Sequence, residues 1–235
     1  MKRQKPIPTA LSPYLEGKVL LIDKPLKWTS FDMVKKVRWM TKIMKVGHAG
    51  TLDPLATGLL IICTGKYTKQ INDYMGMTKE YTGSLVLGAT TASYDLEQEP
   101  ENFKSIEAIT ELKIQEATKQ FIGTILQMPP QHSAIKKDGK RLYESARQGI
   151  EVKVDPRQIT IEQFEITKID LPNVEFRVLC STGTYIRSLV HDFGQALGVG
   201  AYMSGLRRTK IGTFNVEDAI QWEALEKEIN ALLEG

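Results

Sequence analysis

Residues 47–58 read Gly-His-Ala-Gly-Thr-Leu-Asp-Pro-Leu-Ala-Thr-Gly, with three glycines around one acid, Asp53. Glycine allows positive φ angles and a close approach of the backbone, and Pro54 restricts Asp53 to an extended backbone that directs its carboxylate. The surrounding residues are weakly polar and lead into an expected buried strand over 59–64. The segment is therefore either a Gly-rich turn capped by an aspartate or the site of a functional carboxylate that needs a partner.

A second segment, residues 180–187, offers such a partner. It reads Cys-Ser-Thr-Gly-Thr-Tyr-Ile-Arg, so a strand ends, Gly183 turns the chain, and Arg187 falls in the first turn of a helix. The positive end of the helix dipole lies at the N-terminus and repels a cation, and we therefore expect Arg187 to pair with an anion. A buried arginine–carboxylate pair would keep the acid ionised and oriented. The residues alone leave open whether that anion is Asp53.

Around these two segments, short strands alternate with helices. Strands are expected over residues 18–22, 59–64, 81–87, 158–169 and 173–181. Helices are expected over residues 30–41, 68–74, 105–120 and 218–233, with a further helix opened by Gly183. Strands of mixed length between irregularly spaced helices indicate an α+β fold with a mixed sheet, unlike a regular βαβ array.

The helix over residues 30–41 has a clear start signal, because Thr29 and Asp32 have the spacing of a capping box. Apolar residues three apart predict one buried stripe, made of Phe31, Val34, Val37 and Met40. Basic residues form the expected outer face, made of Lys35, Lys36, Arg38 and Lys42. This face is either an ordinary solvated surface or a surface that contacts phosphate.

The composition is that of an ordinary folded protein, with 235 residues, 42% hydrophobic and 25% charged. The length fits one large domain or two small ones. Cys63 and Cys180 each lie in an apolar run, which predicts two buried thiols rather than a disulfide. No run is long enough for a membrane span, and Pro6 and Pro8 interrupt the N-terminus where a signal peptide needs an apolar helix. We therefore expect a cytoplasmic protein.

The net charge of +3 conceals an uneven distribution. Residues 1–80 carry +8, residues 81–135 carry −4, residues 136–158 carry +3, and the remainder carries −4. The small total excludes a strongly basic, indiscriminate binder of nucleic acids, whereas the two positive segments are able to contact phosphate. Cations scattered over a solvated surface explain the same numbers.

Several common sites are absent from the sequence. Neither a P-loop nor a G-x-G-x-x-G loop occurs, so the usual nucleotide-binding turns are missing. His48, His132 and His191 have no histidine or cysteine at metal-ligand spacing, which argues against a zinc site. No G-x-S-x-G elbow of a serine hydrolase is present.

Six short segments, taken together, carry a family resemblance. They are Asp23-Lys24-Pro25 with Trp28-Thr29-Ser30, residues 47–58, Lys79-Glu80-Tyr81, Pro129-Pro130-Gln131 with Ser133-Ala134, residues 183–187, and Gly205-Leu206-Arg207-Arg208. In this order they span about residues 18–210, nearly the whole chain. The chain resembles the TruB-type tRNA pseudouridine synthases.

The resemblance implies a pseudouridine synthase catalytic fold. One domain over residues 1–235 would hold a central, mixed, mainly antiparallel sheet flanked by helices, and residues 127–152 would form a thumb-like segment that clamps RNA. The implied reaction converts uridine 55 in the T loop of tRNA to pseudouridine: uracil leaves its ribose, rotates, and rejoins through carbon, without cofactor or metal. We expect a monomer whose partner is the T-arm stem-loop of tRNA and not a membrane.

The resemblance also assigns roles to residues. Asp53 matches the catalytic aspartate, Tyr81 the active-site tyrosine that stacks on the target base, and Arg187 the arginine that pairs with the aspartate. Positions that line the pocket are matched by Lys24, His48, Tyr185 and Leu206. The target base must be flipped out, and aromatic stacking of roughly 1–3 kcal/mol per base offsets that cost. Two routes stay open: attack of Asp53 on the sugar, or removal of a sugar proton to give a glycal.

Two departures from the family pattern affect the expectations. Many bacterial relatives carry an extra C-terminal RNA-binding domain of the PUA type, which we expect to be missing, so that RNA affinity is weaker and more sensitive to salt. Lys27 stands where the family often has glycine. If that position needs a positive φ angle, Lys27 introduces roughly 1 kcal/mol of strain.

Two other functions would use similar residues. A non-catalytic RNA-binding or RNA-folding protein is possible on the same scaffold, although Asp53, Tyr81 and Arg187 together favour catalysis. A base-excising glycosylase would use the same carboxylate and base flipping but would release free uracil. An assay on a T-arm stem-loop that measures both pseudouridine and free uracil separates the three functions.

Overall fold

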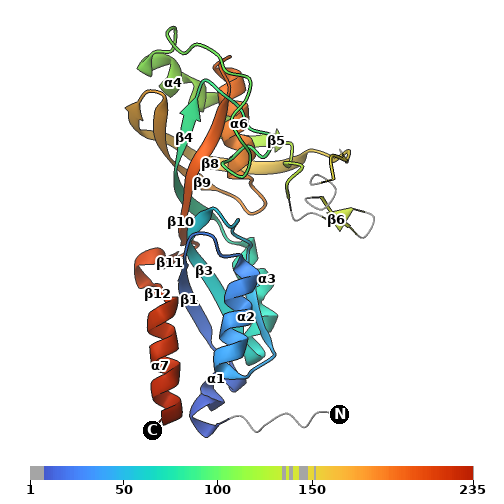
Figure 1. Cartoon of the computed structure of the whole chain (residues 1–235), viewed down its shortest axis with the longest axis vertical. Helices are drawn as coiled ribbons and strands as arrows, with labels where there is room; N and C mark the ends of the chain where they lie inside the picture. The colour runs from blue at the N-terminus through green and yellow to red at the C-terminus, as the bar shows by residue number, and fades with distance from the viewer. Residues whose placement is uncertain (1–7, 134–135, 138–139, 143–147, 151, 235) are drawn as a thin grey trace. The chain divides into compact units, whose positions relative to one another are not determined.

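The computed structural model describes residues 8–133, 136–137, 140–142, 148–150 and 152–234. The chain forms two compact units, and Figure 1 labels their elements. Unit 1 comprises the chain up to Lys79 and from Arg207 onwards, and unit 2 comprises Glu80–Leu206. The prediction of a single catalytic domain over residues 1–235 concerns activity as well as packing. The division into two compact units does not test it, and it stays a prediction.

Unit 1 contains strands in the order β12-β1-β3-β10. They are β1 (Val19–Lys24), β2 (Val46–Ala49), β3 (Ala56–Thr64), β10 (Ala201–Ile211, in this unit from Arg207), β11 (Phe214–Asn215) and β12 (Ile220–Gln221). β1 is parallel to β12 and antiparallel to β3, while β2 pairs with β3 and β11 with β10, both antiparallel. The predicted α+β fold with a mixed sheet is confirmed.

The helices described for unit 1 are η1 (Thr9–Leu11), α1 (Ser12–Glu16), α2 (Ser30–Thr41), η2 (Gly65–Gln70), α3 (Ile71–Gly76), η4 (Val216–Asp218) and α7 (Trp222–Glu234). α2 has the predicted bounds, and Thr29 and Asp32 form the predicted capping box. The short helix predicted over 68–74 spans the end of η2 and the start of α3. The final helix begins at Trp222 instead of residue 218, because β12 comes first and pairs with β1.

The predicted apolar stripe of α2 is wrong at its first residue. Val34, Val37 and Met40 are buried, but Phe31 is 51% exposed, and Met33 is fully buried instead. The reason is the helical period: a step of three residues falls short of a 3.6-residue turn, so a strict three-residue stripe winds around the helix. The buried positions follow alternating steps of three and four.

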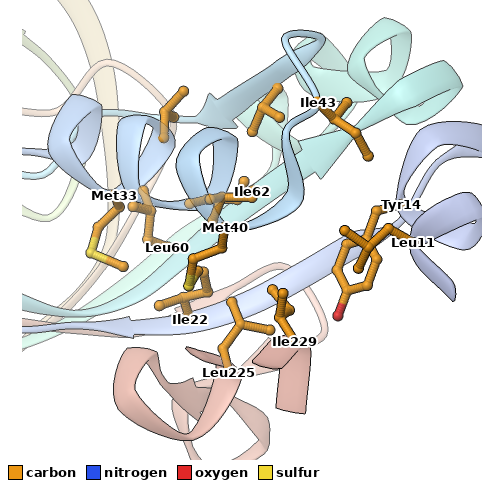
Figure 2. Packing of buried hydrophobic residues seen from close by; sticks show 13 residues of the cluster. Leu11, Tyr14, Ile22, Met33, Met40, Ile43, Leu60, Ile62, Leu225 and Ile229 are labelled. Carbon is orange, nitrogen blue, oxygen red and sulfur yellow. The ribbon is translucent and has the colours of Figure 1, made fainter. Parts of the chain in front are cut away.

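The core of unit 1 lies on both faces of β3. Leu60 and Ile62 pack with α2 and α7, whereas Leu59 and Ile61 pack on the side of η2 and α3. Figure 2 shows the first of these two layers, where side chains of α2, β1, β3 and α7 meet. Burial on both faces explains the continuous apolar run in the sequence. It also anchors the segment 47–58, which leads directly into this strand.

Unit 2 contains strands in the order β10-β4-β9-β8-β5 and a separate β6–β7 pair. Besides β10, which belongs to this unit up to Leu206, its strands are β4 (Lys79–Leu87, in this unit from Glu80), β5 (Gly123–Gln127), β6 (Lys136–Lys137), β7 (Lys140–Arg141), β8 (Arg157–Asp170) and β9 (Asn173–Cys180). Its described helices are α4 (Glu111–Thr118), η3 (Lys119–Phe121) and α6 (Ile186–Ala196). α4 begins later than the predicted residue 105, because the side chain of Thr110 caps it.

The two predicted strands on either side of Pro172 form the antiparallel pair β8–β9. The predicted alternation along β9 is confirmed, since the buried residues are Val174, Phe176, Val178 and Cys180. Neighbouring rings of one aromatic cluster lie 5.3–6.3 Å apart, and its members are Phe121, Phe164, Phe176 and Phe193. This cluster packs α6 against the sheet and so positions the first turn of α6, where Arg187 lies.

Three further expectations concern smaller features. Cys63 and Cys180 are buried thiols, as predicted. Within the parts of the chain that the structure describes, no helix is long and apolar enough to cross a membrane. The predicted RNA-clamping segment over 127–152 lies partly outside the described residues, and its role stays a prediction.

Candidate active site

The loop that carries Asp53 is held by the start of α2. The buried hydroxyl of Ser30 donates to the Leu52 carbonyl at 3.2 Å and accepts from the Leu52 amide at 2.8 Å. The Asp53 carbonyl accepts from the Ala56 amide at 3.0 Å, which closes a turn before β3. These bonds fix the backbone on both sides of Asp53, so its side chain extends from a defined position.

Lys27 adopts a left-handed backbone conformation with a φ angle of 67°, and its amide donates to the Pro54 carbonyl at 2.7 Å. Glycine adopts this angle without strain, so we expect Lys27→Gly to raise the free energy of unfolding by about 1 kcal/mol. Urea unfolding followed by tryptophan fluorescence measures the change in unit 1, which contains all three tryptophans of the chain: Trp28, Trp39 and Trp222. Lys27→Ala is the control, because it removes the charge but keeps the strain. An equal increase in the free energy of unfolding of both variants would show that the effect comes from removing the charge of Lys27.

Lys24 reaches the same loop because of strand register. In the β1–β3 pair it lies opposite Gly58, the last residue of the segment 47–58. Its side chain is fully buried, and Nζ donates to the carbonyls of Pro25 at 2.9 Å and Trp28 at 2.7 Å. A buried amine is thereby held beside the turn that leads into α2.

Arg208 on β10 holds the Asp53 loop at two points. The side chain is 1% exposed; Nε donates to the Leu59 carbonyl at 2.8 Å and Nη2 to the Gly50 carbonyl at 3.2 Å. One guanidinium therefore forms hydrogen bonds with the backbone on both sides of Asp53, at Gly50 and at Leu59. The sequence contains only a weak signal for this role, since Arg208 ends the last family-like segment.

Burial lowers the pKa of Lys24 to about 8, an effect that the charge of Asp53 opposes and that of Arg208 reinforces. In the unfolded chain the ordinary value is 10.5, so between the two values the unfolded state holds more protons. The contribution of Lys24 to stability therefore rises as the pH rises through this window. We expect the unfolding free energy of wild type minus that of Lys24→Met to increase between about pH 7 and about pH 10. Urea unfolding measures it, and a difference that is independent of pH would contradict the lowered pKa.

His48 lies on β2, opposite Ile62 of β3. Burial lowers the pKa of its imidazole, and the nearby charge of Arg208 lowers it further. The ring is therefore neutral at pH 7. A neutral, flat ring suits stacking against a base better than it suits binding a phosphate.

In unit 2, Arg187 occupies the first turn of α6 and is 4% exposed. Its Nε lies 3.5 Å from Oδ2 of the equally buried Asp95. Nη1 donates to the Ser93 carbonyl at 3.2 Å, and Nη2 donates to the His132 carbonyl at 2.9 Å. The prediction that Arg187 pairs with an anion is confirmed, with Asp95 as an anion that the sequence did not reveal. Asp53 belongs to the other unit, and its pairing with Arg187 stays a prediction.

Tyr185, the residue before α6, is fixed through its backbone. The side chain of Gln127 accepts from the Tyr185 amide at 2.8 Å and donates to the Tyr185 carbonyl at 3.0 Å. Tyr81 on β4 is 9% exposed, and Leu206 on β10 is half-buried. Gln127 was missed at the sequence level, because a glutamine at the end of a strand has no distinctive pattern.

The predicted site residues thus form two groups. In unit 1, the buried amine of Lys24 interacts electrostatically with both Asp53 and Arg208, a setting suited to nucleophilic or acid–base chemistry by the carboxylate. In unit 2, Tyr185 and Arg187 lie together at the start of α6. No group of three or more His, Cys, Asp or Glu side chains that could hold a metal occurs among the described residues.

Comparison with protein families gives two consecutive matches. Residues 38–186 match the TruB family pseudouridylate synthase (N terminal domain), and residues 187–234 match the tRNA pseudouridylate synthase B C-terminal domain. The chain is 55% identical over 223 residues to tRNA pseudouridine synthase B of Flavobacterium johnsoniae, which covers 92% of this chain and 97% of that protein. It is 49% identical over 217 residues to the protein of the same name from Phocaeicola vulgatus, covering 90% and 92%.

Among solved structures, the chain resembles one in the crystal structure of a Cbf5-Nop10-Gar1 complex, with a TM-score of 0.72 and 32% sequence identity over 94% of this chain. It spans 56% of the length of that chain. The first family match covers more than half of the present chain and includes Asp53 and Tyr81. By these matches, the chain belongs to the TruB family of pseudouridylate synthases.

Proposed function

We propose that this protein isomerises uridine 55 in the T loop of tRNA to pseudouridine. The bond between C1′ of the ribose and N1 of uracil breaks, the base rotates, and a new bond forms between C1′ and C5. The hydrogen on C5 leaves as a proton and N1 gains one, so the reaction needs no oxidant or reductant. The placement of Asp53 carries this proposal: its carboxylate extends from a loop fixed by Ser30 and Arg208, with Lys24 nearby.

Asp53 is the proposed catalytic residue. As a carboxylate it either attacks C1′ or removes a proton from the sugar, and both routes need it to be ionised. The charge of Asp53 opposes the lowering of the Lys24 pKa by burial, so it favours the ammonium form of Lys24. The family names of relatives at 55% and 49% identity support the same reaction.

The remaining site residues receive roles around the flipped base. Tyr81 is proposed to stack on the uracil and to serve in proton transfer, and Arg187 to orient the catalytic carboxylate. The pocket-lining residues are proposed to be Lys24, His48, Tyr185 and Leu206. Flipping breaks stacking in the T loop, and the aromatic surfaces of Tyr81, Tyr185 and the neutral His48 ring are suited to replace it.

The test uses an unmodified T-arm stem-loop and measures pseudouridine and free uracil in the same reaction. We expect pseudouridine at the position equivalent to 55 and no free uracil. Binding without conversion would favour a non-catalytic RNA-folding protein, and release of uracil would favour a glycosylase. Either outcome would overturn the proposed isomerase.

The tRNA is proposed to bind a monomer in the cytoplasm. A small net charge of +3 with positive segments suits one RNA stem-loop better than general nucleic-acid binding. Light scattering of the protein with and without the stem-loop gives the stoichiometry, and a complex of two chains would contradict the monomer.

A further inference from the structure

One face of α2 is both basic and aromatic. Phe31, Lys35 and Trp39 follow one another at steps of four, and Arg38 lies on the same side because it is seven residues from Phe31. Lys42, the residue that caps the C-terminus of α2, adds a cation whose Nζ lies over the Trp39 ring. These five residues are called the α2 face below. Met33 and Met40 are about half a helical turn away from Phe31, and Figure 2 shows them pointing from α2 into the core.

The two aromatic rings of the α2 face are unusually open to solvent. Phe31 is 51% exposed and Trp39 is 61% exposed. Both rings are bracketed by cations: Nζ of Lys35 lies 5.0 Å and the Arg38 guanidinium 5.9 Å from the Phe31 centroid. Nζ of Lys42 lies 4.8 Å from the centroid of Trp39. The rings and the charges therefore alternate on one surface.

Lys36 lies between the α2 face and α7. Its Nζ contacts the Glu226 carboxylate at 2.7 Å and lies 4.6 Å from the Trp222 centroid and 5.0 Å from the Trp39 centroid. Asp32 is the only acid between residues 31 and 45, and its carboxylate is occupied by the helix cap and by Lys35 at 3.1 Å. The α2 face consequently presents a net positive charge.

We infer that the α2 face is an RNA-binding surface, on which Trp39 and Phe31 stack against bases and the cations contact phosphates. Exposed aromatic rings with cations between them are the combination that binds unpaired nucleotides, since every base has a flat face and every linkage a negative charge. The charge complementarity with a polyanion selects RNA over an uncharged protein partner. This inference rests on the proposed function in so far as tRNA is the RNA that the protein meets.

Trp39→Ala tests the stacking contact. Trp39 lies on the surface, so the fold is expected to persist, and the circular dichroism spectrum checks this. The Kd for a full-length unmodified tRNA transcript, measured by fluorescence anisotropy, should rise roughly fivefold or more. Phe103→Ala is the matched control, because it removes another exposed aromatic ring, which is 77% exposed in unit 2, and should leave the Kd unchanged.

Lys35→Ala tests the phosphate contact. The slope of log K against log salt should become shallower by about one unit, the change expected for a single phosphate contact. Lys168→Ala is the matched control, because the two lysines have similar surroundings. The side chain of Lys168 is 62% exposed and that of Lys35 is 60% exposed, and each forms a surface ion pair. An unchanged slope in Lys35→Ala, or the same change in both variants, would overturn the inference.

Direct contact is read from quenching of Trp39 by RNA. The other two tryptophans, Trp28 and Trp222, are partly buried and pack against each other beside the core, with ring centroids 5.3 Å apart. We expect tRNA to quench wild-type fluorescence and Trp39→Phe to lose most of the quenching. Equal quenching in both proteins would contradict contact at the α2 face, and loss of a wild-type dimer in Trp39→Ala would assign the face to self-association.

The inference and the proposed function can fail separately. If wild type forms no pseudouridine but the α2 variants weaken tRNA binding as expected, the proposed reaction fails and the RNA surface stands. If wild type forms pseudouridine and the variants bind with unchanged Kd and salt slope, the RNA surface fails and the reaction stands.

Discussion

Asp53→Asn is expected to lower the rate of pseudouridine formation at least about a thousandfold, since an amide is neither a nucleophile nor a base at neutral pH. Asparagine keeps the size of the side chain, so the loop fixed by Ser30 and Arg208 should retain its shape. Binding of the T-arm stem-loop should change little, because phosphate contacts supply most of the affinity for RNA. Single-turnover assays with excess enzyme measure the chemical step, and anisotropy measures binding.

Asp73→Asn is the matched control for this variant. Asp73 lies on α3 with an exposed side chain, so the same loss of one carboxylate should leave the rate at the wild-type level. Asp53→Asn with more than about a tenth of wild-type activity would show that this carboxylate is not the catalytic group. A parallel loss of RNA binding would instead assign Asp53 a role in holding the substrate.

Gly58→Ala is expected to destabilise unit 1 by about 2–5 kcal/mol, the sum of backbone strain and overpacking. Gly58 has a φ angle of 102°, and an added Cβ would lie 2.3 Å from the Arg208 carbonyl oxygen and 2.8 Å from its amide nitrogen. Both are backbone atoms of β10, so no side chain can move aside. Urea unfolding followed by tryptophan fluorescence reports on this unit.

Gly50→Ala separates the two contributions. Gly50 has a similar φ angle of 89°, but its added Cβ would come no closer than 3.5 Å, to the Arg208 side chain. We expect Gly50→Ala to lower the free energy of unfolding by the backbone strain alone, about 1 kcal/mol. Equal losses in the two variants would mean that the close approach of β10 to Gly58 contributes nothing to the requirement for glycine.

The helix α2 illustrates how far local sequence patterns reach. Its bounds and capping box depend on neighbours within one turn, and both were predictable from residues 29–41. The predicted buried stripe failed at Phe31 because it assumed a strict step of three residues. With a turn of 3.6 residues, Met33 faces the core that β3 and α7 complete, and Phe31 is exposed.

In the candidate site, too, local sequence patterns identified some charged residues, whereas their partners were revealed only by the structure. The segment 47–58 identified Asp53, and the helix start after Gly183 required an anion near Arg187. Neither pattern indicated Asp95 or Arg208, the buried charges that hold these groups in place. Their partners lie far along the chain, and a loop acid or a strand arginine has no local pattern of its own.

The sequence by itself determined the helix caps, the alternation of the β9 strand and the family-like segments with Asp53, because these depend on spacing between near neighbours. Only the tertiary structure decided which distant groups meet. Arg208 binds the Leu59 carbonyl across 149 residues, and Arg187 binds Ser93 across 94. Such contacts follow from strand pairing and from the desolvation of buried charges, which must find partners wherever the fold supplies them.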